Sequence, residues 1–187
     1  LRITLDPYYN KAVKNAETTP TREVTIMNAF ELLDEPGEFY FNKKTKKVYY
    51  MPEKGEVMNS AEVYAPKIEM LFYINGEDVD KKVENLTFEG FTFSDTCWNF
   101  NKPAYLGQAT EVQSTGGCFA PRAVLIEFAD NVNFEGNCFN NIGGGAIDYR
   151  NACTNCRIVG NVFYDIGESG VVVGSHNHGD FSLGSYN

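Results

Sequence analysis

The sequence predicts a mainly β fold built as a stacked β-solenoid, and an internal repeat is the main observation behind this prediction. Residues 131–143 align without gaps on residues 155–167, at an offset of 24. The repeat consists of short apolar runs split by Gly and Asn, and it contains no helical segment. A further copy, residues 86–95, aligns on residues 132–141 at an offset of 46, which indicates one intervening coil with a loop around residues 101–117.

Equivalent positions of the repeat predict the core, because like residues of successive coils stack about 4.8 Å apart. One apolar ladder is formed by Phe88, Phe134 and Ile158, and a second by Phe93, Phe139 and Phe163. Asn137 and Asn161 also superimpose, each beside a Gly. We expect them to adopt the left-handed conformation at a sharp bend between two strands.

The first 64 residues show no such period, and the sequence predicts that they form an N-terminal cap and hairpin segment. Asn28 is expected to cap a short helical turn. Residues 39–41 and 48–50 flank a polar connector and are expected to pair as a hairpin. Residues 65–187 are assigned to the solenoid coils, and we expect the chain to be a piece of a longer protein because its repeat has not visibly closed.

The charge of the chain argues against two classes of partner. It has 187 residues with 16 Lys and Arg against 25 Asp and Glu, so its formal net charge is −9. Such a chain lacks the basic surface that nucleic acids or anionic membranes attract. No apolar run approaches the roughly 20 residues of a membrane-spanning helix, so membrane insertion is not expected either.

The cysteines do not predict a disulfide framework or a metal centre. Their number is five, which is odd, and their spacing is irregular. Cys153 and Cys156 have the C-x-x-C spacing of redox and zinc sites. A zinc site would need a second ligand pair, and a thioredoxin-type motif would need a helix after a strand, so the sequence favours neither.

Several segments resemble the bacterial right-handed parallel β-helix proteins related to secreted glycoside hydrolases. They are residues 28–41, 48–52, 83–93, 145–149 and 161–167. The resemblance implies a right-handed parallel β-helix with three strands per coil, about 22–24 residues per coil and an irregular β-rich N-terminal cap. It also implies an extracellular, cell-surface or periplasmic enzyme that hydrolyses glycosidic bonds of a plant or host polysaccharide or oligosaccharide through outward-facing carboxylates, without a cofactor.

The candidate catalytic carboxylates follow from the search for two acidic groups facing one sugar. If Ile147 points into the core, alternation turns Asp148 outward as an exposed carboxylate on a rigid strand. Its equivalent in the next coil is Val172, so no repeated ladder explains Asp148. Glu168 precedes the strand that should stack on the strand of Asp148. Asp165 is a weaker catalytic candidate, because turns favour Asp for conformational reasons.

Four other residues are candidates for substrate binding. Arg150 lies two positions after Asp148, and a plain Asp148–Arg150 surface pair is the structural alternative. His176 and His178 share one face if extended and suit a sugar-binding loop better than a metal pair, since a third ligand is not obvious. Trp98 lies in a loop and could stack on a sugar, although a lone Trp beside apolar neighbours is more often packed.

Two alternative functions remain open. In a polysaccharide lyase of the β-helix type, a basic residue such as Arg150 would abstract a proton beside a uronate carboxylate while Ca²⁺ is held by acidic ligands. In a non-catalytic solenoid, the coils would bind glycans or space other domains. The fold alone does not distinguish these functions. A non-catalytic solenoid is favoured if no second carboxylate lies near Asp148.

Overall fold

The structure, a computed structural model, describes residue 26, residues 28–99 and residues 120–174. The chain divides into two compact units, Leu1–Val63 and Tyr64–Asn187. Within the described residues the helical elements are two 3-10 turns, η2 (Phe30–Leu32) and η3 (Met58–Ser60), and all other regular elements are strands. The predicted mainly β character is therefore confirmed.

The first unit contains the predicted hairpin. β1 (Phe39–Asn42) pairs antiparallel with β2 (Lys47–Tyr50), and the connector turns back through Lys46, whose φ is 58°. The side-chain oxygen of Asn42 accepts hydrogen bonds from the backbone of Lys44 and Thr45, both at 3.0 Å. A short polar side chain at the start of the connector thus supplies the turn with local partners.

Asn28 has a different role from the predicted one. The residue that precedes η2 is Ala29, which makes no side-chain capping hydrogen bond. Instead Asn28 lies at φ 54°, and its Oδ1 accepts from the backbone N–H of Phe41 at 2.8 Å. The prediction of an N-cap was wrong, because the amide finds a partner on the hairpin rather than on the turn that follows it in sequence.

The second unit is a succession of short strands. They are β3 (Phe72–Asn75), β4 (Val83–Glu89), β5 (Thr92–Thr96), β6 (Arg122–Glu127), β7 (Ala129–Glu135), β8 (Cys138–Ile142), β9 (Gly145–Asn151), β10 (Arg157–Val159), β11 (Val162–Phe163) and β12 (Val171–Val173). Every strand pairing among the described residues of this unit is parallel.

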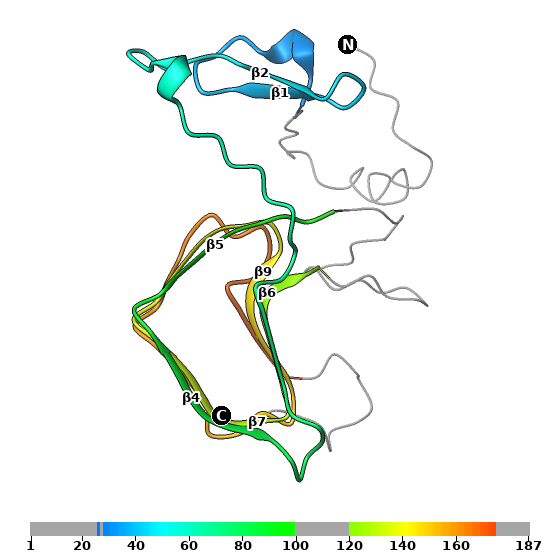
Figure 1. The fold of residues 1–187 in the computed structure, drawn as a ribbon, viewed down its shortest axis with the longest axis vertical. Helices are drawn as coiled ribbons and strands as arrows, with labels where there is room; N and C mark the ends of the chain where they lie inside the picture. Colours follow the sequence, from blue (N-terminus) through cyan, green and yellow to red (C-terminus); the bar gives the residue numbers. More distant parts are fainter. Residues whose placement is uncertain (1–25, 27, 100–119, 175–187) are drawn as a thin grey trace, which may run out of the picture. The chain divides into compact units, whose positions relative to one another are not determined.

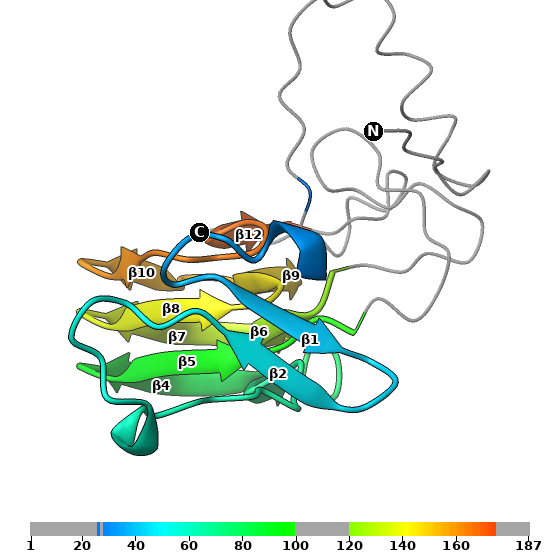
Figure 2. The same ribbon diagram turned by 90° about the horizontal axis from the view of Figure 1, so that it is seen from above.

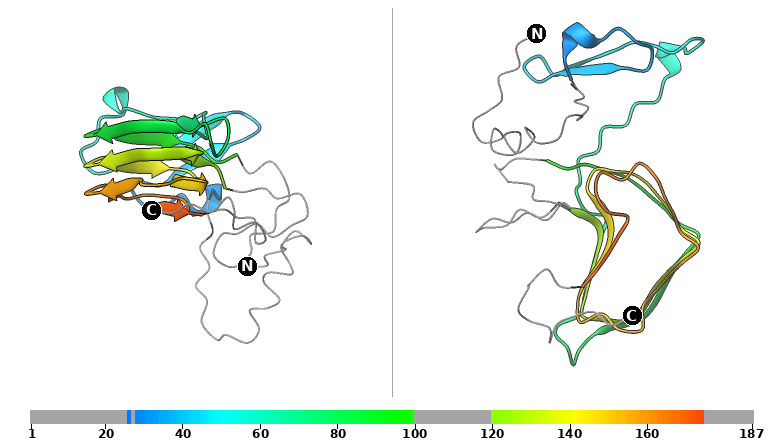
Figure 3. Two further views of the ribbon diagram at one scale, coloured as in Figure 1. Left: turned by 90° about the horizontal axis from the view of Figure 1, so that it is seen from below. Right: turned by 180° about the vertical axis from the view of Figure 1, so that it is seen from behind.

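These strands form three sheets, with orders β10-β7-β4, β11-β8-β5 and β12-β9-β6-β3. The chain visits each sheet in turn, so successive strands lie in different sheets and each strand stacks on the one a full circuit earlier. Figure 1 and the right view of Figure 3 look along the stack, where the strands overlie one another around an interior, and Figure 2 and the left view of Figure 3 show the layers from the side. The parallel sheets fit a β-helix, as predicted, and the right-handed arrangement with three strands per coil stays a prediction.

The register corrects one prediction about the coils. Phe88 pairs directly with Phe134, and Phe134 pairs with Ile158. The offset of 46 between residues 88 and 134 therefore spans one circuit with extra residues between β5 and β6, not two circuits with a coil between them. The repeat alignment was right, but the number of coils that it implied was wrong.

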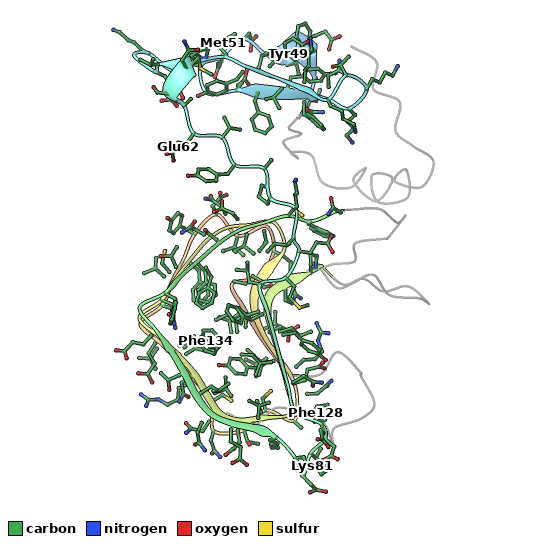
Figure 4. All side chains as sticks on the ribbon, viewed as in Figure 1. Tyr49, Met51, Glu62, Lys81, Phe128 and Phe134 are labelled. Atoms are coloured by element: carbon green, nitrogen blue, oxygen red, sulfur yellow. The ribbon has the colours of Figure 1, made fainter. Side chains whose placement is uncertain are left out.

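Both predicted core ladders are confirmed. The rings of Phe93 and Phe139 stack with centroids 4.5 Å apart, and those of Phe139 and Phe163 with centroids 5.0 Å apart. In the other ladder the rings of Phe88 and Phe134 stack at 4.8 Å. Phe134 and Phe139 are completely buried, and Figure 4 shows the ring of Phe134 inside the outline of the coils.

Backbone conformation at the bends also repeats from coil to coil, but at other residues than predicted. Three series of equivalent positions have positive φ: Gly90, Gly136 and Gly160; Asn85, Asn131 and Asn155; Asp95, Asn141 and Asp165. Asn137 and Asn161 are absent from these series, so the prediction of a left-handed conformation there was wrong. In the bend that holds Asn137, the left-handed residue is the preceding glycine.

The side chain of Asn137 instead ties three coils together. Its Oδ1 accepts from the N–H of Phe91 at 2.9 Å, and its Nδ2 donates to the carbonyl of Phe88 at 2.9 Å. Asn161 Oδ1 accepts from the backbone N–H of Asn137 at 2.8 Å. The Asn positions are therefore a hydrogen-bonded ladder at the bend, which satisfies backbone groups that the turning strands leave unpaired.

Candidate functional site

The candidate site lies on β9, where charged side chains occupy the face opposite to the core. Ile147 and Tyr149 belong to the hydrophobic core, and Ile147 pairs with Val171, as the alternation predicted. Asp148 lies between them, opposite Val172 of β12. Its exposed fraction is 0%, so the expectation of an exposed carboxylate was wrong.

Two arginines account for the burial of Asp148. Its Oδ2 accepts from Nε of Arg122 at 3.3 Å and from Nη2 of Arg150 at 2.8 Å. Only 4% of the Arg122 side chain and 22% of the Arg150 side chain are exposed. Because a buried carboxylate needs partners for its charge, the arginines make the position tolerable.

Glu168 joins the same cluster through Arg122. Its Oε2 accepts from Nη1 of Arg122 and from the backbone N–H of Ser169, the latter at 2.9 Å. The Glu168 side chain is 3% exposed. Glu168 and Asp148 therefore lie in one cluster, because the guanidinium group of Arg122 contacts both carboxylates.

A glycine makes room for this arrangement. Arg122 begins β6 and lies directly opposite Gly145 of β9. A Cβ atom at position 145 would overlap with Nη1 of Arg122 and would lie 2.7 Å from Oε2 of Glu168. The close approach of the guanidinium to the strand therefore requires the absence of a side chain at Gly145.

The electrostatics of the cluster are close to balanced. Arg122 and Arg150 supply two positive groups, and Asp148 and Glu168 supply two acidic groups. Burial lowers the pKa of the Arg122 guanidinium, while the charge of Asp148 opposes this effect. A preorganised charged cluster of this kind can orient a polar ligand.

The remaining predicted site residues lie elsewhere. Asp165 is exposed in the bend after β11, at φ 52°, in the same conformation as its equivalents Asp95 and Asn141. Its repeated backbone conformation supports the turn interpretation. Trp98 follows β5 and is half-buried. Its backbone lies close to Gly143, since a Cβ atom at position 143 would be 2.8 Å from the backbone nitrogen of Trp98. His176 and His178 lie outside the described residues.

The cysteine motif occupies the interior. Cys153 and Cys156 are both buried, and burial raises the pKa of the Cys156 thiol. In the part of the chain that the structure describes, no group of three or more His, Cys, Asp and Glu residues is arranged to hold a metal ion. The described residues also contain no helix long and apolar enough to cross a membrane.

Three residues of this surface escaped the sequence analysis. Arg122 begins an otherwise apolar run, and a charge in a buried strand signals an internal partner. Tyr73 and Glu127 lie on neighbouring strands of the same sheet, and the Tyr73 hydroxyl donates to Glu127 Oε2 at 2.7 Å. Their signal is weaker, because an alternating polar residue on a strand usually just faces solvent.

Comparison with known proteins gives one informative similarity. No family model and no curated protein matches the chain. A solved structure named "Glycoside hydrolase" is similar to it, with a TM-score of 0.63 and 30% sequence identity over 77% of this chain. This chain spans 28% of the length of that protein.

Proposed function

We propose that this chain is part of a carbohydrate-active enzyme that hydrolyses glycosidic bonds of a polysaccharide or oligosaccharide. The observation that carries the proposal is the 30% identity to the solved structure named glycoside hydrolase over 77% of this chain. The parallel sheets support it, since β-helices present long polar outer faces to extended ligands. The proposal includes right-handed coils of three strands. It also includes an extracellular, bacterial cell-surface or periplasmic location.

Asp148 and Glu168 are the proposed catalytic pair. Hydrolysis needs one carboxyl group to protonate the leaving oxygen and a second to attack the sugar or activate water. Both side chains contact Arg122, so their separation falls within the upper limit of about 9.5 Å for such pairs. Arg122 is then a positioning residue, and Arg150 is the proposed substrate contact beside Asp148.

The test is hydrolysis by the whole chain carrying Asp148→Asn or Glu168→Gln. The probes are arabinoxylan, mixed-linkage β-glucan and polygalacturonate, and the readout is release of reducing ends. We expect wild-type release from at least one probe and a loss of at least about 100-fold in each variant, the scale on which acid–base groups contribute. Products that absorb in the ultraviolet would instead favour the lyase alternative.

A matched control separates chemistry from folding. Asn137→Ala removes a buried polar side chain whose hydrogen bonds go to Phe88, Phe91 and Asn161 and not to the charged cluster. It should lower stability while leaving hydrolysis unchanged below its melting temperature. If the two site variants behave like this control, Asp148 and Glu168 are not catalytic.

A second candidate function is supported by the burial of Asp148. A carboxylate that is 0% exposed and paired with two arginines resembles a structural ion cluster, which suits a non-catalytic glycan-binding solenoid. Binding of a probe without release of reducing ends would favour this candidate.

A further inference from the structure

A polar and aromatic group lies beside the charged cluster on the outer face of the same sheet. Tyr73 of β3 pairs with Leu125 of β6, and Leu125 pairs with Asp148 of β9. Cross-strand partners in parallel strands lie on one face, so Tyr73 and Asp148 share it with one strand between them. At a strand spacing of about 4.8 Å, their backbones are roughly 10 Å apart.

A hydrogen bond holds the Tyr73 hydroxyl, although about half of the residue is solvent-exposed. The exposed fraction of Tyr73 is 54%, and its hydroxyl donates to Glu127 Oε2 at 2.7 Å. The amide of Asn151 donates to the other oxygen of Glu127. This hydrogen bond from Tyr73 to Glu127 raises the pKa of the phenol, and the charge of Arg150 opposes the shift.

The strand register explains why these three residues converge. The pairing of β6 with β9 shifts between Ile126 and Glu127, so that Glu127 pairs with Asn151 rather than with Arg150. A bulge of this kind re-aims side chains and often occurs beside functional sites. Here the bulge brings Asn151 opposite Glu127, so that the Asn151 amide reaches the carboxylate.

The chemistry of this group matches a sugar ring. An exposed aromatic face offers apolar contact to the C–H face of a pyranose, and a half-exposed carboxylate offers acceptors for hydroxyl groups. A carboxylate has about four acceptor positions, and the hydrogen bonds from Tyr73 and Asn151 use two of those of Glu127. A site built on strands also holds its geometry better than one on loops.

We propose that Tyr73, Glu127 and Asn151 form a sugar-binding subsite, in which the Tyr73 ring stacks on one sugar residue of a polysaccharide and Glu127 accepts its hydroxyl groups. The subsite rests on the proposed carbohydrate function and deepens it, since Tyr73 lies on the same sheet face as Asp148 with one strand between them. Its occupant is the sugar adjacent to the bond at the charged cluster.

The experiment is affinity gel electrophoresis of the whole chain in gels containing arabinoxylan, mixed-linkage β-glucan or polygalacturonate. Tyr73→Ala should weaken retardation by about tenfold in dissociation constant, whereas Tyr73→Phe should change it by less than about threefold because the ring remains. Glu127→Gln should fall between them. The matched control is Tyr164→Ala, which removes a ring that is 55% exposed outside this sheet.

Each outcome decides something. Weaker binding for Tyr73→Ala than for Tyr164→Ala, with equal melting temperatures, supports the subsite. Equal retardation of these two variants overturns the subsite and leaves the carbohydrate function standing. A wild-type chain that none of the three polysaccharides retards overturns the subsite together with the function on which it rests.

Discussion

The inner and outer faces of β9 are organised on opposite principles. On the inner face, Ile147 and Tyr149 join a core in which apolar residues recur at equivalent positions, as in the ladder of Phe93, Phe139 and Phe163. On the outer face, Asp148 is followed in the next coil by Val172, so its charge occurs once. Repeated residues therefore indicate positions that the fold requires, whereas an unrepeated polar residue indicates a local arrangement that the fold alone does not require.

The largest expected effect tests the inner face. Phe139→Ala should lower the free energy of unfolding by about 3–5 kcal/mol, because Phe139 is completely buried and its removal opens a cavity between the stacked rings of Phe93 and Phe163. Urea unfolding followed by circular dichroism measures it. A loss below about 1 kcal/mol would mean that the ladder does not hold the coils together.

The next effect tests the outer face. Asp148→Asn should lower the free energy of unfolding by about 1.5–3 kcal/mol, since it removes the charge that Arg122 and Arg150 share in a buried site. The same urea titration measures it, and an unchanged midpoint would show that the cluster is solvated in solution.

A smaller effect tests whether packing around Arg122 matters. Gly145→Ala should lower the free energy of unfolding by about 1–3 kcal/mol, because the added methyl group displaces the guanidinium from Glu168. The measurement is the melting temperature, compared with that of Gly145→Ala combined with Arg122→Ala. If Arg122→Ala does not reduce the loss of melting temperature that the added methyl group causes, the methyl group clashes with a residue other than Arg122.

The smallest effect isolates backbone strain. At Gly136 a Cβ would contact nothing within 4 Å, but φ is 62°. Gly136→Ala should therefore lower the free energy of unfolding by about 1–2 kcal/mol through conformation alone. Gly136→Asn is the control, since Asn tolerates this conformation better than Ala. Equal melting temperatures for the two variants would contradict the explanation by strain.

The residues also show what sequence reasoning could reach. The core was predictable because its positions repeat: Phe134 and Phe139 have partners 46 and 24 positions away that any alignment of the coils reveals. The burial of Asp148 was not, because its partner Arg122 lies 26 residues earlier, on another strand, and belongs to no repeat. Alternation gives the face of a side chain, but only the neighbours on that face determine whether water reaches it.

The predictions of local conformation at three Asn residues were wrong for a related reason. Asn28 precedes a helical turn and has the composition of a cap, yet its amide binds the backbone of Phe41, 13 residues away. The bend residues Asn137 and Asn161 were recognised as a ladder, while their role as hydrogen-bonding groups depended on which neighbouring residue, Gly136, takes the strained conformation. A motif of short polar residues predicts that a partner exists without identifying it.

The unequal spacing of the coils has a consequence for how such a protein can change. Between β8 and β9 the chain turns in two residues, Gly143 and Gly144, whereas 25 residues separate β5 from β6, at the equivalent corner of the preceding circuit. The strands on either side of the corner nevertheless pair directly, with Thr96 opposite Ile142 and Arg122 opposite Gly145. This corner therefore accepts long insertions at little thermodynamic cost, while the bend stapled by Asn137 does not. Grafted loops, new specificity segments or peptide tags should be introduced there.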